Sequence, residues 1–515
     1  AMKGADIFLG LSAANVLSAD MVKSMAEGPI LMALANPDPE IRPELAREAR
    51  PDCIIATGRS DYPNQVNNVL CFPFIFRGAL DVGATTINEE MKLACVRALA
   101  DLAVAEASDI VASAYGDQSL TFGPEYLIPK PFDPRLIVEV APTVAKAAME
   151  SGVARRPIED FDAYRDSLSQ FVYHSGLVMK PLFDRAREDM RRLVYAEGEE
   201  TQVLRAVQIV IDDGLARPIL IGRRRVIEMR IERLGLRIRL DQDVEICDPE
   251  DDPRYREYWS LYHQLTERRG VTPDAAREIV RTRTTVIAAL MVARGEADAL
   301  ICGVVGRYDR HLRHLREIIG LRQGVADASA AELLIMPKGT VFMADTNVSY
   351  EPSAQELADT AILVAELVRR FGLTPKVALV SHSSFGSTDT ESAVRMRDAL
   401  ALIQRLEPGL EVEGEMRANS AMSESVRSRF FPNSALTGQA NVLILPTLDA
   451  ANIAFNLALS LGDGLSVGPI LIGMAKPAHI VGQSVTVRGL VNMSALAAVD
   501  AQAHSAGEMG ALAAK

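Results

Sequence analysis

Short apolar runs alternate with amphipathic stretches along the first hundred residues. The runs at 6–10, 29–35 and 53–57 each have the length of a buried strand and end at turn residues. Ser18 stands where it would cap a helix beginning at the next residue, and 91–107 carries apolar residues at helical spacing over a longer stretch. Because strands separated by helices form βαβ units, the pattern predicts a parallel sheet in an α/β fold.

This rhythm pauses and then restarts further along the chain. Residues 108–175 are rich in proline, glycine and other turn residues, and we expect a closing helix and a linker there. From 176 onward the alternation returns, with strands expected at 193–198, 217–222, 297–305, 377–381 and 441–446. A second, larger α/β domain is therefore predicted to follow the first.

Composition narrows the possible classes of protein. The chain has 515 residues, of which 48% are hydrophobic and 24% charged, as is typical of folded globular domains. Its formal net charge of −13 opposes contact with phosphate backbones, so we expect no nucleic-acid partner. No apolar run reaches the roughly 18 residues of a membrane span, so we expect no membrane partner either.

The cysteines indicate the compartment. There are five, widely spaced, and none forms a CxxC pair. That spacing favours neither a disulfide framework nor a structural zinc site. We interpret them as reduced thiols in a cytoplasmic protein.

A dense polar cluster follows the third predicted strand. The segment 58–68 reads Gly-Arg-Ser-Asp-Tyr-Pro-Asn-Gln-Val-Asn-Asn, and ligands of open parallel sheets bind at the carboxyl ends of the strands. The carboxamides of Asn67 and Asn68 offer donors and acceptors that suit a carboxylate or a nicotinamide amide. Capping of the next helix is the alternative role for either one. Asn36 stands at the end of the preceding strand and brings a third amide to the same edge.

These segments resemble the cofactor domain of bacterial malic enzymes. The resemblance rests on 33–37 (Ala-Leu-Ala-Asn-Pro), 56–68, 76–81 (Phe-Arg-Gly-Ala-Leu-Asp) and 87–92 (Ile-Asn-Glu-Glu-Met-Lys). It implies oxidative decarboxylation of malate to pyruvate and CO2, with NADP and with Mg2+ or Mn2+. It also implies that Asn36, Asn67 and Asn68 contact malate and the nicotinamide ribose.

Other parts of that family's pattern are not found in this sequence. No GxGxxG motif occurs, and the family's catalytic Tyr and Lys and its acidic metal ligands precede the dinucleotide unit. The resemblance therefore implies that an N-terminal part is absent from this chain, which holds no catalytic and no metal-binding residue and is expected to be inactive alone. We expect 1–107 to be the C-terminal part of an NADP-binding domain with a partial Rossmann-like fold.

The second domain resembles phosphate acetyltransferases over about 176–505. The matching segments include 195–198 (Tyr-Ala-Glu-Gly), 303–306 (Gly-Val-Val-Gly), 342–345 (Phe-Met-Ala-Asp), 381–387 (Ser-His-Ser-Ser-Phe-Gly-Ser) and 468–477 (Gly-Pro-Ile-Leu-Ile-Gly-Met-Ala-Lys-Pro). The resemblance implies a two-lobed α/β phosphotransacetylase-like domain at 176–510, with one lobe at 176–335 plus 470–510 and the other at 336–469. It also implies a cleft that binds coenzyme A and acetyl phosphate.

Two groups of residues in this domain are candidates for holding an anionic ligand. Arg307 and Arg310 begin a basic helix just after a GxxG turn, where helix N–H groups favour phosphate; a solvated helix face is the alternative. Ser381, Ser383 and Ser387 lie on a loop after a predicted strand, where hydroxyls and backbone N–H groups could cradle a phosphate. A serine-rich surface turn is the alternative for that loop.

The domain departs from the transferase pattern before the basic helix, where Arg307-Tyr308 replaces a Thr-rich stretch, and more importantly near its end. Transacetylases carry a Ser-Arg pair shortly after the Lys-Pro dipeptide, and the matching positions here are Gly482 and Gln483. Neither side chain can act as an acid, a base or a phosphate clamp. We therefore interpret the domain as a non-catalytic acetyl-CoA sensor. An active phosphate acetyltransferase and a pure ligand-binding or assembly fragment are the alternatives.

The resemblance also implies a homo-oligomer built on dimers of the second domain. The alanine-rich stretch 491–503 carries Met493 and Leu496 on its apolar side. Helices of this kind pack closely, either across a subunit contact or within their own domain, and both roles remain open. The expected partners are thus malate, acetyl-CoA as an effector, and further copies of the chain.

Overall fold

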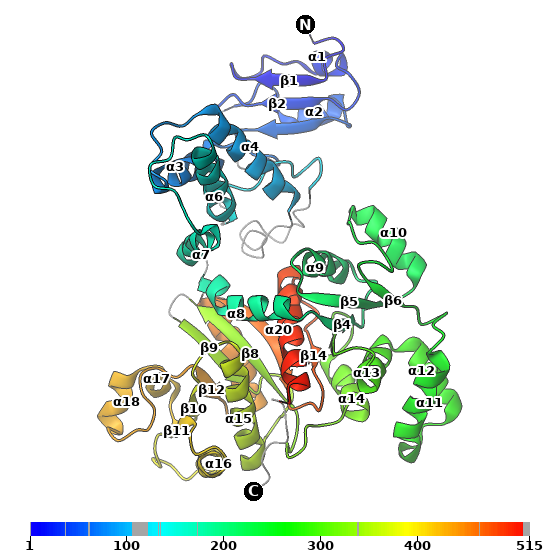
Figure 1. Cartoon of the computed structure of the whole chain (residues 1–515), viewed down its shortest axis with the longest axis vertical. Helices are drawn as coiled ribbons and strands as arrows, with labels where there is room; N and C mark the ends of the chain where they lie inside the picture. The colour runs from blue at the N-terminus through cyan, green and yellow to red at the C-terminus, as the bar shows by residue number, and fades with distance from the viewer. Residues whose placement is uncertain are drawn as a thin grey trace. The chain divides into compact units, whose positions relative to one another are not determined.

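The computed structural model describes residues 2–36, 38–59, 62–105, 122–131, 133, 135–172, 174–336, 339–462 and 464–507. The chain divides into two compact units, Ala1–Tyr173 and His174–Lys515. Each unit is described by itself below (Figure 1).

A three-stranded parallel sheet opens the first unit, in the order β1-β2-β3. Its strands are β1 (Ile7–Gly10), β2 (Ile30–Ala33) and β3 (Ile54–Thr57), and its helices are α1 (Ala19–Lys23) and α2 (Pro43–Ala49). Ser18 caps α1 by accepting the backbone N–H of Met21, as the sequence predicted. One face of the sheet packs Leu31, Ala33 and Ile55 against these two helices. The predicted parallel sheet is confirmed.

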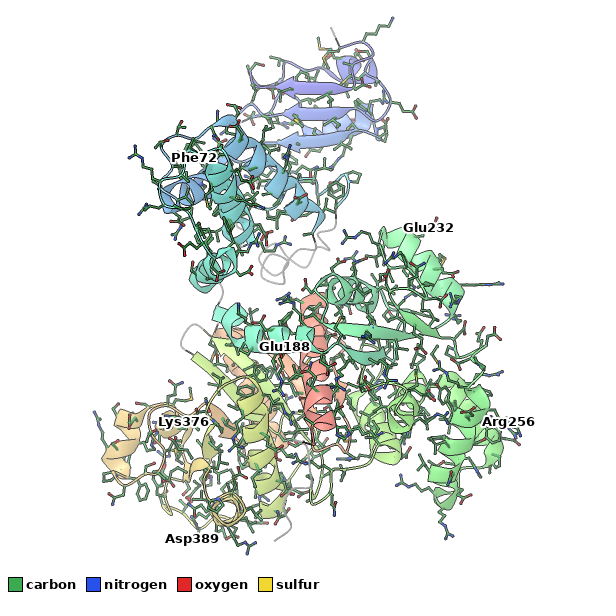
Figure 2. All side chains as sticks on the ribbon, in the orientation of Figure 1. Phe72, Glu188, Glu232, Arg256, Lys376 and Asp389 are labelled. Carbon is green, nitrogen blue, oxygen red and sulfur yellow. The ribbon has the colours of Figure 1, made fainter. Side chains whose placement is uncertain are left out.

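A helical layer completes the first unit. It consists of η1 (Asn68–Leu70), α3 (Phe72–Asp81), α4 (Glu89–Val104), α6 (Arg135–Glu150) and α7 (Phe161–Val172). The packing of α3 on α6 is so close that a Cβ on Gly78 would lie 2.4 Å from the carbonyl oxygen of Ala141. Figure 2 shows Phe72, which is 61% exposed, on the outside of this layer.

The expected linker contains structured helices. Residues 108–121 lie outside the described part, but 135–150 forms α6 and 161–172 forms α7, where the sequence predicted one closing helix and a linker. α6 forms despite Pro142 because Leu136, Val140, Val144 and Ala148 recur at helical spacing, and all four are buried. Apolar periodicity therefore outweighed the proline content of this segment.

The second unit contains two sheets. The five-stranded sheet has the order β14-β7-β4-β5-β6 and is entirely parallel. Its strands are β4 (Arg191–Tyr195), β5 (Ala216–Ile221), β6 (Glu245–Cys247), β7 (Ala299–Cys302) and β14 (Ala478–Ile480). The six-stranded sheet has the order β11-β10-β12-β9-β8-β13, with β8 antiparallel to both of its neighbours. Its strands are β8 (Ser329–Met336), β9 (Gly339–Ala344), β10 (Lys376–Val380), β11 (Glu411–Met416), β12 (Val442–Ile444) and β13 (Leu465–Ile472).

Helices cover both faces of each sheet. They are α8 (His174–Glu188), α9 (Thr201–Asp212), α10 (Arg224–Leu234), α11 (Tyr255–Thr266), η2 (Glu267–Arg269), α12 (Pro273–Thr282), α13 (Thr284–Arg294), α14 (Tyr308–Ile318), α15 (Ala354–Arg370), α16 (Glu391–Leu406), α17 (Ala418–Ala421), α18 (Glu424–Phe430), α19 (Leu448–Leu461) and α20 (Val487–Ser505). Side chains alternate along each strand: Leu193 and Tyr195 face one core cluster, and Val194 faces another. The expected boundary at 335/336 falls within β8, so that strand belongs to the six-stranded sheet and not to the first lobe.

The late alanine-rich helix has an intradomain role. Figure 1 shows α20, in red, in the middle of the second unit, and its residues Leu490, Met493 and Leu496 have no exposed surface. The helix contacts α8 and α9 together with strands from both sheets. Of the two roles considered from the sequence, this burial supports packing within the domain.

Candidate functional site

The strand ends of the first unit are fixed by a buried carboxylate. Glu40 has no exposed surface; its Oε1 accepts the backbone N–H of Ser12 at 2.9 Å, and its Oε2 accepts that of Ala35 at 3.0 Å. Glycine is required at position 10, because a Cβ there would lie 2.5 Å from the carboxyl carbon of Glu40. Glu40 thus joins the segments that follow β1 and β2.

The segment after β3 is anchored in a similar way. Asn64 is buried and adopts a left-handed conformation, with φ of 54°. Its Nδ2 donates to the carbonyls of Ile55 at 3.1 Å and Pro124 at 2.7 Å, and its Oδ1 accepts the N–H of Leu127 at 2.7 Å. Asn64 is therefore a positioning residue that sets the path of the chain toward Asn67.

All three predicted asparagines of the first unit are exposed. Asn36 lies three residues after β2. Gln65, two residues before Asn67, bridges Thr57 at the end of β3, so all three asparagines lie in segments that follow the carboxyl ends of neighbouring strands. The side chain of Asn67 also accepts the N–H of Val69 at 3.0 Å, which is the capping role considered from the sequence. Capping uses only the oxygen of this carboxamide, which leaves its NH2 donors for a ligand.

A large cavity in the second unit opens at the carboxyl ends of β4, β5 and β7. Its volume is about 1270 Å³, and its walls include the segments after these strands and the first turns of α13 and α14. Both predicted arginines, Arg307 and Arg310, line it. The position agrees with the general rule that ligands of parallel sheets bind beyond the strand ends. We call it the arginine cavity.

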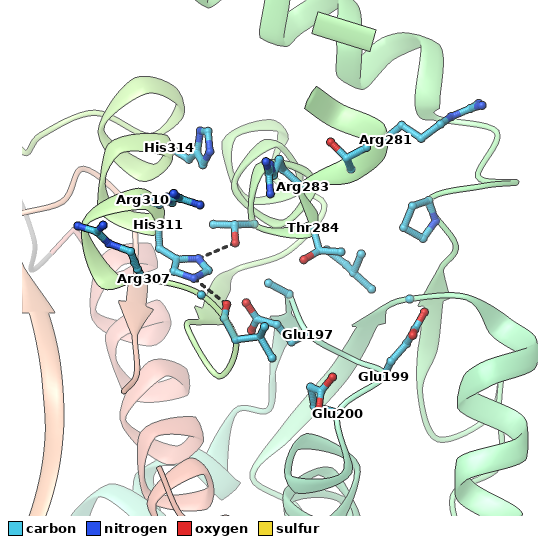
Figure 3. A pocket seen from close by; sticks show the side chains of 18 of the residues that line it. Glu197, Glu199, Glu200, Arg281, Arg283, Thr284, Arg307, Arg310, His311 and His314 are labelled. Atoms are coloured by element: carbon cyan, nitrogen blue, oxygen red, sulfur yellow. Dashed lines mark hydrogen bonds between the residues drawn. The ribbon is translucent and has the colours of Figure 1, made fainter. Parts of the chain in front are cut away.

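Side chains of both charges line the arginine cavity, and its six arginines outnumber its five acidic residues, which include Glu200 and Glu250. Among the arginines that line it, Arg223 is held by Glu199 at 2.9 Å and Arg307 by Asp309 at 3.0 Å. Arg283, Arg310 and Arg313 form no ion pair with any described residue. Figure 3 shows Arg310 on α14 and Arg283 at the start of α13 among the side chains that line this cavity. This arrangement suits an anionic ligand.

The floor of the arginine cavity contains a carboxyl group and a histidine. Glu197 accepts the N–H of Gly303 at 3.1 Å, and burial raises its pKa to about 7. His311 is held between the hydroxyl of Thr285 at 2.8 Å and the carbonyl of Val305 at 3.0 Å (Figure 3), and burial lowers its pKa. Both environments favour the neutral form of the side chain, so the floor adds little charge below neutral pH.

A second cavity, of about 1070 Å³, lies between the strand ends of the two sheets. It is lined by Gly303 and Gly482 from the five-stranded sheet and by Asn347 and Leu448 from the six-stranded sheet. Gln483 also lines it, and the Gln483 amide donates to the carbonyl of Gly306. We call this the interlobe cavity. Gly482 and Gln483, the two positions that match the Ser-Arg pair of transacetylases, thus line it, and neither of these two side chains is charged. Four residues at or near the start of α14 line both cavities: Gly306, Arg307, Asp309 and Arg313.

The predicted serine loop lies elsewhere. Ser381, Ser383 and Ser387 follow β10, and none of them is among the described residues that line either cavity. Their hydroxyls are used within the loop: Ser383 Oγ lies 3.0 Å from Ser387 Oγ, and Ser381 Oγ accepts the N–H of Ser383 at 3.3 Å. The structure therefore does not bring these serines together with the arginines.

Sequence reasoning missed part of the arginine cavity. Arg281 and Arg283 come from the junction of α12 and α13, a hundred residues before the serine loop, and Glu197 comes from the turn after β4. Arg281 and Arg283, just before the apolar run 286–293, were a usable signal, because charged residues at such a junction must face solvent or a ligand.

Two functional classes of site are not present in the described residues. The part of the chain that the structure describes has no group of three or more His, Cys, Asp or Glu side chains able to hold a metal ion. Its helices include none that is long and apolar enough to cross a bilayer.

The fold is a two-lobed α/β domain with cavities at its strand ends, preceded by a small parallel sheet and its helices. Residues 177–498 match the phosphate acetyl/butaryl transferase model, and residues 2–112 match the NAD binding domain of malic enzyme. The chain therefore belongs to the phosphate acetyl/butaryl transferase family and carries a malic enzyme NAD binding domain before that region. Both resemblances stated from the sequence are confirmed.

Curated relatives share this combination over most of the chain. Over 96% of its own residues, the chain is 60% identical to the NAD-dependent malic enzyme of Rhizobium meliloti. Over 97% of its own residues, it is 58% identical to the NADP-dependent malic enzyme of Escherichia coli. It spans 65% and 66% of these relatives, respectively. The EutD phosphotransacetylase structure from Staphylococcus aureus matches with a TM-score of 0.58 and 26% identity, covering 63% of this chain and 98% of that chain.

Proposed function

We propose that this chain is part of an enzyme that oxidatively decarboxylates malate to pyruvate and CO2 with NADP. The observation that carries the proposal is the set of exposed carboxamides, Asn36, Asn67 and Asn68, in segments that follow neighbouring strands of a parallel sheet that matches the malic enzyme NAD binding domain. The malic enzyme names of the relatives support it, and they include both NAD and NADP. The malate-oxidising activity is proposed for a longer protein that spans the full length of these relatives, and not for the 515 residues alone.

The strand-end asparagines fit the proposed cofactor and substrate. A carboxamide can donate to a malate carboxylate and accept from a ribose hydroxyl without changing the charge of the site. NADP, when bound, supplies the hydride acceptor. The chain's own residues bind and orient: Glu40 and Asn64 fix the two segments, and the asparagines present their amides. A divalent ion does not fit the described residues, and no role for one is derived from them.

The direct test is a substitution series in the enzyme of the relatives' length. Asn68→Ala should raise the KM for malate or lower kcat, while Asn433→Ala, an exposed asparagine after α18 in the second unit that lines neither cavity, should leave both unchanged. Equal kinetics in all three proteins would contradict the role of the strand-end amides. Initial rates with NAD and with NADP in the same enzyme decide the cofactor.

The second unit is proposed to bind acetyl-CoA without transferring its acetyl group. Two observations support this: the arginine cavity has cationic side chains without anionic partners, and Gly482 and Gln483 line the interlobe cavity in place of a Ser-Arg pair. The match to phosphotransacetylase structures supports a coenzyme A ligand. We assign the phosphates of that ligand to Arg283 and Arg310, and the domain's role to regulation.

An assay of acyl transfer separates this proposal from an active transferase. The chain is incubated with acetyl phosphate and coenzyme A, and acetyl-CoA formation is followed. No formation above the enzyme-free rate is expected. Turnover well above that rate would establish the transferase alternative. A chain that binds neither coenzyme A nor acetyl-CoA in calorimetry would instead be an assembly module.

Homo-oligomer formation is proposed to use α19 in place of α20. α19 presents an exposed apolar stripe of Ile453 (59% exposed), Leu457 (56%) and Leu461 (82%), spaced four residues apart. Such a stripe is stabilised by burial against a second copy. A dimer of the second unit through this helix is the state we expect.

A further inference from the structure

Two of the five cysteines lie side by side in the first unit. The sulfur atoms of Cys71 and Cys95 are 3.3 Å apart, and both thiols are free. Cys71 stands at the N-cap of α3 and is half-buried, whereas Cys95 lies within α4 and is 1% exposed. The other three cysteines are buried in separate strands or strand flanks. We propose that Cys71 and Cys95 are a redox-sensitive pair that peroxide converts into a disulfide.

The geometry permits the bond with a small movement. A disulfide requires sulfur atoms about 2.0 Å apart, so the two must approach by roughly a further 1.3 Å. Cys71 is well placed to supply that motion, because it joins the end of η1 to the beginning of α3 and not the middle of a helix. Cys95 is fixed in the core cluster formed by α3, α4 and α6.

The environments of the two sulfurs set the order of events. Burial raises the pKa of the Cys95 thiol to about 12, so Cys95 is a poor first target for an oxidant. Cys71 retains solvent access and meets peroxide first. Its thiol is oxidised to a sulfenic acid as one oxygen of H2O2 is transferred and one water is released. The sulfur of Cys95 then attacks that sulfenic sulfur, and the second water leaves as the S–S bond forms.

The consequence falls on the turn that carries Asn67 and Asn68. The N–H of Cys71 donates to the carbonyl of Asn68 at 3.2 Å, and the N–H of Leu70 to that of Asn67 at 3.1 Å. A disulfide from Cys71 to α4 therefore ties one end of this turn to the helical core. The oxidised form holds the turn more rigidly than the reduced form. This effect follows from the contacts alone and does not depend on malate being the ligand.

The test uses the 515-residue chain treated with equimolar H2O2 under native conditions, followed by thiol blocking and tryptic digestion without reduction. We expect a cross-link between peptides 60–77 and 93–97, which hold Cys71 and Cys95, and its loss on treatment with dithiothreitol. Cys71→Ser and Cys95→Ala should each abolish it. Cys53→Ser, a buried cysteine of the same unit, is the matched control and should retain it.

Several outcomes would overturn the proposal. They are five unmodified thiols after treatment, over-oxidation of Cys71 without a cross-link, and a cross-link that requires denaturation. Because Cys95→Ala alters a core position, the parent chain provides a second readout through amide hydrogen exchange. Oxidation should slow exchange at Val69, Leu70 and Cys71 several-fold, and dithiothreitol should reverse the change. Unchanged exchange in the cross-linked chain would contradict the effect on the turn.

Discussion

Arg310 is the residue on which the proposed effector site most depends. It lies on the first turn of α14, lines the arginine cavity, and has no anionic partner among the described side chains. A hydrogen bond to a charged group contributes about 1.5–3 kcal/mol, so Arg310→Ala should weaken acetyl-CoA binding roughly ten- to hundredfold. Calorimetry on the 515-residue chain measures the change. The matched control is Arg256→Ala, an exposed arginine on α11 outside both cavities (Figure 2).

A dissociation constant for Arg310→Ala equal to that of the parent would place the phosphates elsewhere. An equal loss of affinity in Arg256→Ala would mean that the effect is general electrostatic attraction and not a contact.

Glu197 predicts a pH dependence of stability. Its pKa is raised by burial from 4.5 to about 7, so the folded state binds an extra proton between these values. Stability therefore falls as pH rises through this window, and the full cost is present above about pH 7. Glu197→Gln removes that cost. The difference in free energy of unfolding between the variant and the parent should therefore grow by roughly 1–3 kcal/mol from about pH 5 to about pH 8. Melting temperatures measured across this range check the trend. Glu232→Gln, an exposed carboxyl on α10, is the control and should show no such trend.

At the scale of elements, the close approach of α3 and α6 gives a stability prediction. The Cβ of Gly78→Ala would lie 2.4 Å from a backbone carbonyl, so the helices must separate. Such overpacking costs about 1–3 kcal/mol, and thermal unfolding of the first unit should shift to lower temperature by several degrees. Gly409→Ala, where a Cβ meets open space, should leave the melting temperature unchanged. A stable Gly78→Ala would contradict this packing.

Sequence patterns predicted most strands but only some helix roles. The strands at 6–10, 29–35 and 53–57 could be predicted because apolar runs bounded by turn residues report burial directly. One closing helix was expected in 108–175 but two form there, because proline and glycine content was weighted above the apolar periodicity of α6. The partner of α20 could not be predicted, since periodicity shows that a face is buried but not what covers it.

The candidate site shows the same limit. Arg307 and Arg310 could be predicted because they follow a GxxG turn that opens a helix. Arg283 and Glu197 reach the same cavity only through the parallel order β7-β4-β5, which the sequence does not display. The serine loop was misplaced because a strand-end loop gives no indication of which cavity it faces.

At the scale of the whole molecule, the α19 stripe predicts the oligomeric state. Leu457→Glu places a charge in the centre of the stripe and should convert a dimer into a monomer in light scattering at micromolar concentration. Met229→Glu, on α10, is 57% exposed and is the matched control, which should remain dimeric. A monomeric parent chain, or a dimeric Leu457→Glu, would contradict the proposed interface.

Regulation requires that acetyl-CoA bind one state of the enzyme better than another, because a ligand with equal affinity for all states shifts nothing. A coupling of about 1–3 kcal/mol would change the apparent affinity for malate roughly 5- to 150-fold.

The most direct measurement is malate-dependent NADPH formation by a protein that spans the full length of the relatives. It is titrated with acetyl-CoA in the parent and in the Arg310→Ala variant. The account predicts inhibition of the parent and a markedly weaker inhibition of the variant at similar uninhibited rates. Malate oxidation in the parent that acetyl-CoA leaves unchanged up to millimolar concentration would contradict it.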